Sequence, residues 1–285
     1  MQYFLLLSVV LGAFLQNVFQ KQYNLKTQGI NNASYVYNFM MAATSCILMI
    51  IVALFGFTFH LETLYYSLVF SVSYSLAVIF LFLAIHYGPL SLSSLFISFS
   101  LIIPTFYGLI FQQEQLSVFG IIGLICVFIS IIMINSYKKG DKLSLKWFIF
   151  VILGFLGNGI CSTVQKVHQI NFPGMYQVEF MALAMIVVTL IMGILLIFNR
   201  PTEFKPILKK GGVYASLTGG LNGMVNLLML VLAAMLPATV LYPIVSGGGI
   251  ALTFIVALTF YREKLSVVQY IGYFAGVASV ILLSF

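Results

Sequence analysis

Residues 174–198 read GMYQVEFMALAMIVVTLIMGILLIF, and Glu179 is the one charged residue among them. A helix rises ~1.5 Å per residue, so about 20 apolar residues are needed to cross the ~30 Å hydrocarbon core of a bilayer. The strands of a membrane barrel alternate apolar and polar side chains, and this stretch does not. It therefore predicts a membrane-spanning α-helix.

The composition of the whole chain agrees with this prediction. Of its 285 residues, 62% are hydrophobic and 7% are charged, whereas soluble domains carry about 25% charged residues. A soluble fold cannot hide so much apolar surface. This excludes an ordinary soluble enzyme, a nucleic-acid-binding module and a disordered chain. Three dispersed cysteines offer neither a disulfide framework nor a CxxC spacing, and we interpret them as packing residues.

Nine further segments have the length and apolar character of a span. Residues 2–20 lack a basic n-region and a small-residue cleavage site, so we expect a mature span there and not a signal peptide. Pro89 and Pro237 suit the first turn of the helix that follows each of them. The ten predicted spans are 2–20, 34–57, 63–86, 89–111, 117–136, 145–165, 174–198, 211–235, 238–260 and 266–284.

The cations between the spans predict the orientation. Twelve of them fall in the loops after spans 1, 5, 7 and 9, and the other side has only Lys166. Positive loops stay in the cytoplasm, so both termini are expected outside the cytoplasm of a multi-pass cell-membrane protein, and the residue usage suggests a bacterial one. The twelve are Lys21, Lys26, Lys138, Lys139, Lys142, Lys146, Arg200, Lys205, Lys209, Lys210, Arg262 and Lys264.

The two halves of the sequence, 1–140 and 141–285, share short motifs in the same order. Each half has five predicted spans, and since five is odd the halves would enter the membrane in opposite senses, as an inverted repeat. The matched pairs, at offsets of 145, 141 and 149 residues, are Gln20-Lys21 with Gln165-Lys166, Phe39-Met40 with Phe180-Met181, and Glu114-Gln115-Leu116-Ser117 with Glu263-Lys264-Leu265-Ser266. The predicted fold class is therefore an all-α polytopic membrane protein of ten helices in two inverted five-helix repeats.

One stretch carries a family resemblance. Phe260-Tyr261-Arg262-Glu263-Lys264-Leu265-Ser266 is followed by Tyr270-Ile271-Gly272 and a terminal apolar helix, and residues 111–117 with Gly120 and Gly123 are its first-half partner. Together with Pro237 and Tyr242-Pro243, this pattern resembles the drug/metabolite transporter superfamily of the EamA type. The layout matches over the whole chain, and the specific motif matches twice over about fifteen residues. The resemblance implies a secondary transporter that moves small metabolites or drugs, often outward, without ATP hydrolysis. Commoner members keep both termini in the cytoplasm, so the opposite cation bias here leaves the direction of transport open.

Polar side chains inside apolar spans are the candidate substrate contacts, because a polar group in hydrocarbon needs a partner or a water-filled cavity. Twelve residues meet this description: Gln16, Asn17, Gln20, Lys21, Asn38, Tyr74, Lys166, Glu179, Asn222, Asn226, Tyr242 and Ser246.

Each candidate also has a structural interpretation. Glu179, expected about five residues inside its span, would otherwise be solvated in the headgroup layer. Lys21 and Lys166 would otherwise snorkel to the interface. The amides and hydroxyls would otherwise serve as interhelical hydrogen-bonding groups. If Glu179 titrates, the proton is the expected coupling ion, and otherwise the protein is a facilitator.

Other motifs favour structural roles. Ser117 and Ser266 are predicted helix caps. Glu114 lies just before Ser117, and its negative charge is predicted to interact favourably with the positive end of the dipole of the helix that follows. Residues 247–249 are three glycines that indicate close packing or local unwinding, since they lack the features of a phosphate loop. Gly272 and Gly276 suit an internal helix contact or a dimer face, which predicts a monomer or a weak homodimer.

No catalytic motif is visible. There is no HExxH, no GxSxG and no close Cys/His set; His60 and His168 are expected in loops and His86 at a span end.

We therefore predict a non-enzymatic secondary transporter for a small organic solute, without metal or cofactor, working by alternating access. Spans 1, 2, 3, 6, 7, 8 and 9 would line its cavity, and spans 5 and 10 would be scaffold. The alternatives are an intramembrane lipid-modifying enzyme, which needs a catalytic constellation, and a non-transporting scaffold, which has no need of an inverted repeat.

Overall fold

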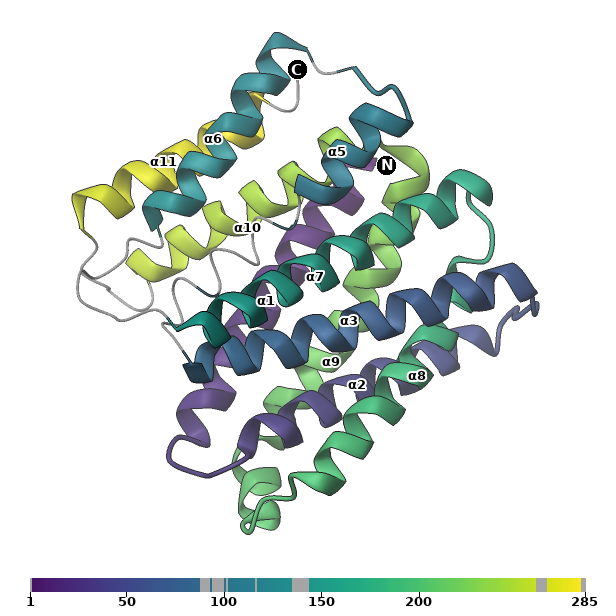
Figure 1. Cartoon of the computed structure of the whole chain (residues 1–285), viewed down its shortest axis with the longest axis vertical. Coiled ribbons are helices and arrows are strands. Elements are labelled where there is room, and N and C mark those ends of the chain that lie inside the picture. The colour runs from purple at the N-terminus through teal and green to yellow at the C-terminus, as the bar shows by residue number, and fades with distance from the viewer. Residues whose placement is uncertain are drawn as a thin grey trace. The chain divides into compact units, whose positions relative to one another are not determined.

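The computed structural model describes residues 2–87, 93, 100, 102–115, 117–134, 144–259 and 266–282, and no strand occurs among them. The helices are α1 (Gln2–Lys26), α2 (Ala33–Ala53), α3 (Leu61–Tyr87), α5 (Ile102–Phe111), α6 (Val118–Ile134), α7 (Leu145–Asn171), α8 (Gln177–Phe198), α9 (Phe204–Met235), α10 (Ala238–Thr259) and α11 (Val267–Leu282) (Figure 1).

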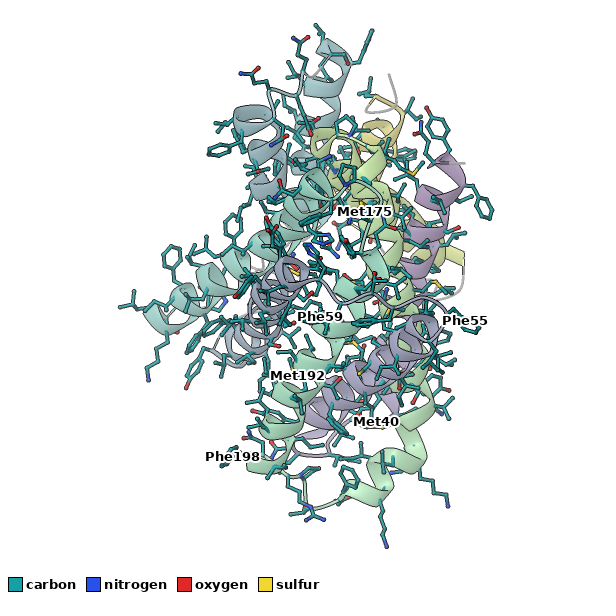
Figure 2. The ribbon with its side chains drawn as sticks, turned by 90° about the vertical axis from the view of Figure 1, so that its right-hand side faces the viewer. Met40, Phe55, Phe59, Met175, Met192 and Phe198 are labelled. Atoms are coloured by element: carbon teal, nitrogen blue, oxygen red, sulfur yellow. The ribbon has the colours of Figure 1, made fainter. Side chains whose placement is uncertain are left out.

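Six helices of the described residues are long and apolar enough to cross a membrane, namely α1, α2, α3, α7, α8 and α9. Their outer faces are apolar as well. On α8, Ile197 is 74% exposed and Phe198, which Figure 2 labels, is 81% exposed. Water would penalise such surfaces, whereas lipid tails match them. The chain is therefore a helical protein of the multi-pass membrane type, as predicted.

Several predicted ends are wrong, because three helices continue past the apolar run. Helix α1 reaches Lys26 instead of ending at residue 20, α7 reaches Asn171 instead of ending at residue 165, and α9 begins at Phe204 instead of at residue 211. An apolar run ends where the hydrocarbon ends, but backbone hydrogen bonding can continue into the polar interface. Residues expected in loops are therefore helical: Lys21, Lys26, His168, Lys205, Lys209 and Lys210.

Two compact units make up the structure, and neither corresponds to one half of the sequence. Unit 1 comprises Met1–Ser75 and Val167–Ala234, and unit 2 comprises Leu76–Lys166 and Met235–Phe285. The chain passes from one unit to the other within α3, α7 and α9. Each unit therefore combines helices from both halves of the chain.

In unit 1, α2 packs against α8, and the two lie side by side in Figure 1. Hydroxyls of α3 bond to α8 as well, since Ser67 Oγ donates to the Phe180 carbonyl at 3.1 Å and Ser71 Oγ to the Ala184 carbonyl at 3.0 Å. Helix α9 approaches α2 closely at Gly219, where a Cβ would overlap the Met41 carbonyl oxygen.

In unit 2, α6 packs against α11, and α10 packs against α5 and α11. The serine caps of α6 and α11 are confirmed. Ser117 Oγ accepts the Gly120 N–H at 3.0 Å. Ser266 Oγ accepts the Gln269 N–H at 3.3 Å, and Gln269 Oε1 accepts the Ser266 N–H at 2.9 Å, which is a reciprocal capping box.

Some sequence predictions concern residues outside the described part of the chain. These are the turn at 88–89, the lysines at 138, 139 and 142, and the motif of residues 260–265 with Arg262, Glu263 and Lys264.

The close approach of α9 to α2 yields a stability prediction. We expect Gly219→Ala to destabilise the protein by about 1–3 kcal/mol, because the new methyl must displace backbone. Gly220→Ala is the matched control, since a Cβ at Gly220 meets nothing within 4 Å. Thermal unfolding in detergent would measure both. Equal unfolding temperatures for the two variants would contradict the packing described for Gly219.

Candidate functional site

Four of the candidate residues form one hydrogen-bonded group inside unit 1, which we call the amide cluster: Gln16 of α1, Tyr74 of α3, and Asn222 and Asn226 of α9. Asn222 Nδ2 donates to Gln16 Oε1 at 3.1 Å, and the Tyr74 hydroxyl donates to Asn222 Oδ1 at 3.4 Å. Asn226 Nδ2 donates to the Asn222 backbone carbonyl at 2.9 Å and to Asn222 Oδ1 at 3.3 Å. Three helices therefore meet at Asn222.

Small residues make this meeting possible. Gly12 lies one turn before Gln16, and a Cβ there would overlap the Val225 side chain of α9. Gly223 lies directly after Asn222 and leaves only ordinary contact distance to Ser45 of α2. On α3, the Phe70 ring stacks on Tyr74 with 5.8 Å between ring centroids. The glycines set how close the backbones come, and the side-chain amides then reach each other.

The amide cluster carries no formal charge, but one of its hydrogen-bond donors is not used within the cluster. Gln16 Oε1 is used by Asn222, while the Nε2 of Gln16 has no hydrogen-bond partner in the part of the chain that the structure describes. The Gln16 side chain is half-buried, so a ligand acceptor can reach it. A primary amide has two N–H donors. This arrangement can hydrogen-bond a polar solute within an otherwise apolar surrounding.

Glu179 is a buried carboxylate at the start of α8 and not five residues inside it. It is the third residue of the helix and is 6% exposed, so its side chain is not solvated. Its Oε1 accepts the Thr58 N–H at 3.0 Å and the Thr58 hydroxyl at 2.9 Å. Glu179 therefore joins the segment before α3 to the first turn of α8, where the helix dipole favours a negative charge.

A network around His168 was missed by the sequence reasoning, which placed this residue in a loop. Gln169 Oε1 accepts the Gly174 N–H at 3.1 Å, and its Nε2 donates to the Met175 carbonyl at 3.2 Å. These two backbone partners fix the amide, so its Nε2 must also donate to His168 Nδ1 at 2.9 Å. The hydrogen bonds thus assign the His168 proton to Nε2, which lies 3.2 Å from Thr63 Oγ1.

The tautomer has a chemical consequence. A second proton on His168 would set an N–H against the N–H of Gln169, so the network favours the neutral ring. Thr63 in turn lies 3.5 Å from Nδ1 of His60, whose ring stacks on Tyr176. The signal available in the sequence is the group of polar residues Gln165, Lys166, His168 and Gln169, which follows the apolar run of the sixth predicted span.

In unit 2, the buried Lys166 and the half-buried Glu114 form a pair at the N-terminus of α10. Lys166 is 7% exposed, and its Nζ donates to the Leu236 carbonyl at 2.7 Å and lies 3.8 Å from Glu114 Oε1. Glu114 Oε1 accepts the Ala238 N–H at 2.9 Å, and Oε2 accepts the Thr239 N–H at 3.0 Å and its hydroxyl at 2.9 Å.

This corrects two predictions. Glu114 caps α10, which begins 124 residues later in the chain than Glu114 itself, and not the helix that directly follows it. Lys166 neither snorkels to the interface nor stands as an open cation, because the Glu114 carboxylate and a backbone carbonyl engage it.

The other candidates lie outside these groups. On α1, Asn17 and Gln20 are exposed and Lys21 is half-buried, and Asn38 of α2 is half-buried. The buried Tyr242 donates its hydroxyl to the Ser162 carbonyl at 2.6 Å, and Ser246 is half-buried on α10. Helix α10 is continuous over the three glycines, so the alternative of local unwinding there is wrong.

Comparisons with known proteins show the fold and nothing about the function. No family model and no curated protein matches the sequence. Among solved structures 27 chains match. One of them, titled "Crystal structure of protein", has a TM-score of 0.79 and 10% sequence identity, and the match covers 99% of this chain and 95% of that chain. The protein therefore shares the fold of a protein with a solved structure.

The Glu114 contacts predict a stability effect. We expect Glu114→Gln to lower the unfolding temperature, because the new amide N–H groups would face the N–H donors of α10 and leave Lys166 with a neutral partner. Loss of a helix cap costs about 0.5–2 kcal/mol, and the loss of the charge beside the buried Lys166 adds to this cost. Glu62→Gln, at an exposed residue in the first turn of α3, is the control. Thermal unfolding in detergent would decide, and an unchanged midpoint for Glu114→Gln would contradict the assignment.

Proposed function

We propose that the protein is a secondary transporter, which moves a small organic solute across the cell membrane by alternating access. The observation that carries this proposal is the amide cluster. A buried hydrogen-bonding group in an apolar helical unit is costly unless it has partners. Here it has partners and a remaining half-buried donor on Gln16.

The depth of the amide cluster supports a transport site. Gln16 lies near the midpoint of α1 and Tyr74 near the midpoint of α3, while Asn222 lies within one turn of the midpoint of α9. Substrate sites of secondary transporters lie near the bilayer midplane. A scaffold has no need of polar groups at this depth, and an amide with an open donor suits a neutral or zwitterionic polar solute.

We further propose ten spans arranged as two inverted five-helix repeats, as in the EamA type of the drug/metabolite transporter superfamily. The repeat matches span 2 with span 7, span 4 with span 9 and span 5 with span 10. Three of the helix pairs that pack together within the units belong to these matched spans, namely α2 with α8, α5 with α10 and α6 with α11; α10 also packs against α11. Pairing of equivalent helices is what a pseudo-two-fold axis produces.

The proposed orientation keeps both termini outside the cytoplasm. Lys26, Lys205, Lys209 and Lys210 are exposed, as orienting cations should be. Lys166, the one cation predicted on the opposite side, is buried in its pair with Glu114 and therefore does not oppose this orientation.

Proton coupling would involve Glu179. Its carboxylate holds Thr58 through two hydrogen bonds to one oxygen. Proton binding would weaken both bonds, because a neutral carboxyl is a poorer acceptor than a carboxylate. The segment before α3 would then be released from α8, which is a local change of the kind that alternating access requires.

The amide cluster can be tested without knowing the solute in advance. A thermal-shift screen of metabolites on the purified protein should give a hit, since a ligand stabilises the state that it binds. We expect Gln16→Leu to weaken that hit about tenfold or more, corresponding to about 1.4 kcal/mol for one hydrogen-bonded group. Gln20→Leu, one turn further along the same helix and exposed, should leave affinity unchanged. Wild-type affinity in Gln16→Leu would remove the amide cluster from the site.

Coupling is tested separately in proteoliposomes that contain the protein and the screened solute. We expect Glu179→Gln to abolish the response of uptake to an imposed pH gradient, because the amide cannot exchange a proton. Glu62→Gln is the matched carboxylate control. Gradient-driven uptake that persists in Glu179→Gln would show that Glu179 carries no proton, while solute counterflow would still report on transport itself.

A further inference from the structure

A groove of about 740 Å³ runs between α2 and α9 of unit 1. Met40, labelled in Figure 2, and Thr44 form its α2 wall, and Gly212, Ser216 and Gly220 lie along its α9 side. Val213 and Leu217 line it as well and are 70% and 45% exposed, so the groove opens to the surroundings of the protein.

The glycines on the two sides of α9 have different surroundings: one set packs against other helices and the other set borders the groove. One row, with four-residue spacing, packs against α1 and α2, as a Cβ at Gly211 would overlap Tyr23 and a Cβ at Gly219 would overlap α2 backbone. The other row forms the groove. A Cβ at Gly220 meets nothing within 4 Å, and one at Gly212 would only touch Met40 at 3.8 Å. The space beside the second row is therefore not filled by the described protein.

The groove leads to a basic helix end. Residues four apart share a face of a helix, so Lys205 and Lys209 stand in line with Val213 and Leu217 of the groove. Both lysines are exposed, and neither forms an ion pair with the described residues. The distance from Lys209 to Gly220 is eleven residues, or ~17 Å of helix. One leaflet of the hydrocarbon core is about 15 Å deep.

We propose that this groove binds an anionic phospholipid of the surrounding bilayer. One acyl chain lies in the groove over Gly212, Ser216 and Gly220, and the phosphate is held by Lys209 and Lys205. The stretch of α9 from Lys209 to Gly220 matches the depth of one leaflet, and the cations lie at the end where a headgroup would lie. Basic residues near the membrane surface attract anionic lipids. This inference requires only a protein embedded in a membrane and does not depend on the transport proposal.

A second copy of the chain fits the groove less well. A symmetric dimer in a membrane has its two-fold axis along the membrane normal, so two copies meeting at this groove would bring Lys205 and Lys209 of each copy to the same depth. Like charges would then repel across the contact. An anionic headgroup has the complementary charge.

The test uses the full-length protein in nanodiscs of phosphatidylglycerol and phosphatidylcholine. Native mass spectrometry then identifies the lipids that stay bound when the protein is released from the nanodisc. We expect the wild type to retain phosphatidylglycerol preferentially. Lys209→Gln should lower that preference about fivefold, which is the contribution expected of one lysine near the surface. Lys210→Gln removes the same charge one residue away, about 100° around the helix from Lys209, and should lower the preference less.

A second variant tests the acyl chain. Gly220→Leu should place its side chain in the groove and reduce retention of both lipids severalfold. Its unfolding temperature in detergent should stay near that of the wild type, because a Cβ at this position meets nothing within 4 Å and the groove lies beyond it. If Lys209→Gln and Lys210→Gln lowered the preference for phosphatidylglycerol equally, the preference would come from general attraction of anionic lipids to a basic surface. That result would overturn the proposal. Wild-type lipid retention in Gly220→Leu, or a dimer that this substitution dissolves, would overturn it as well.

Discussion

The close approach of α9 to α1 and α2 is the contact on which the rest of unit 1 depends. Gly211 and Gly219 let α9 lie against the Tyr23 side chain and the Met41 backbone, where any Cβ would overlap. In a bilayer there is no hydrophobic gain from joining two apolar helices, so packing and interhelical hydrogen bonds decide which helices associate. The glycine row provides the packing, and Ser45 of α2 adds a hydrogen bond to the Gly219 carbonyl. Only with this spacing can Asn222 reach Gln16.

Two carboxylates form hydrogen bonds between segments that are distant in sequence. Glu179 binds Thr58, and Glu114 binds the first residues of α10 and lies beside Lys166. Both lie at helix starts, where free N–H groups and the dipole favour an acceptor. A chain with six acidic residues thus commits two of them to holding its own loops and helix ends. The amide cluster, which carries the proposed site, has no formal charge.

Hydroxyl groups perform a related role along α3. Thr63, Ser67 and Ser71 follow one another at four-residue spacing, and they contact His168, the Phe180 carbonyl and the Ala184 carbonyl in turn. Ser75, one further turn along, is buried and has no hydrogen-bond partner among the described residues. It is also the last residue of unit 1 before the chain continues into unit 2. The hydrogen-bonded contact of α3 with α8 therefore ends where the chain leaves the unit.

The sequence by itself determined which segments are helical and apolar. The length of an apolar run is a local property, and it can be compared directly with the thickness of a bilayer. It also determined the serine caps at Ser117 and Ser266, whose partners lie three residues away, and the polar residues Gln16, Tyr74, Asn222 and Asn226. Only the tertiary structure decided where α1, α7 and α9 end, since polar residues stop an apolar run without stopping a helix. It alone decided that Glu114 caps α10, that Lys166 is paired and that His168 belongs to a buried network. Such partners come from segments far away in the chain, and nothing in the local pattern of residues specifies which of them will meet.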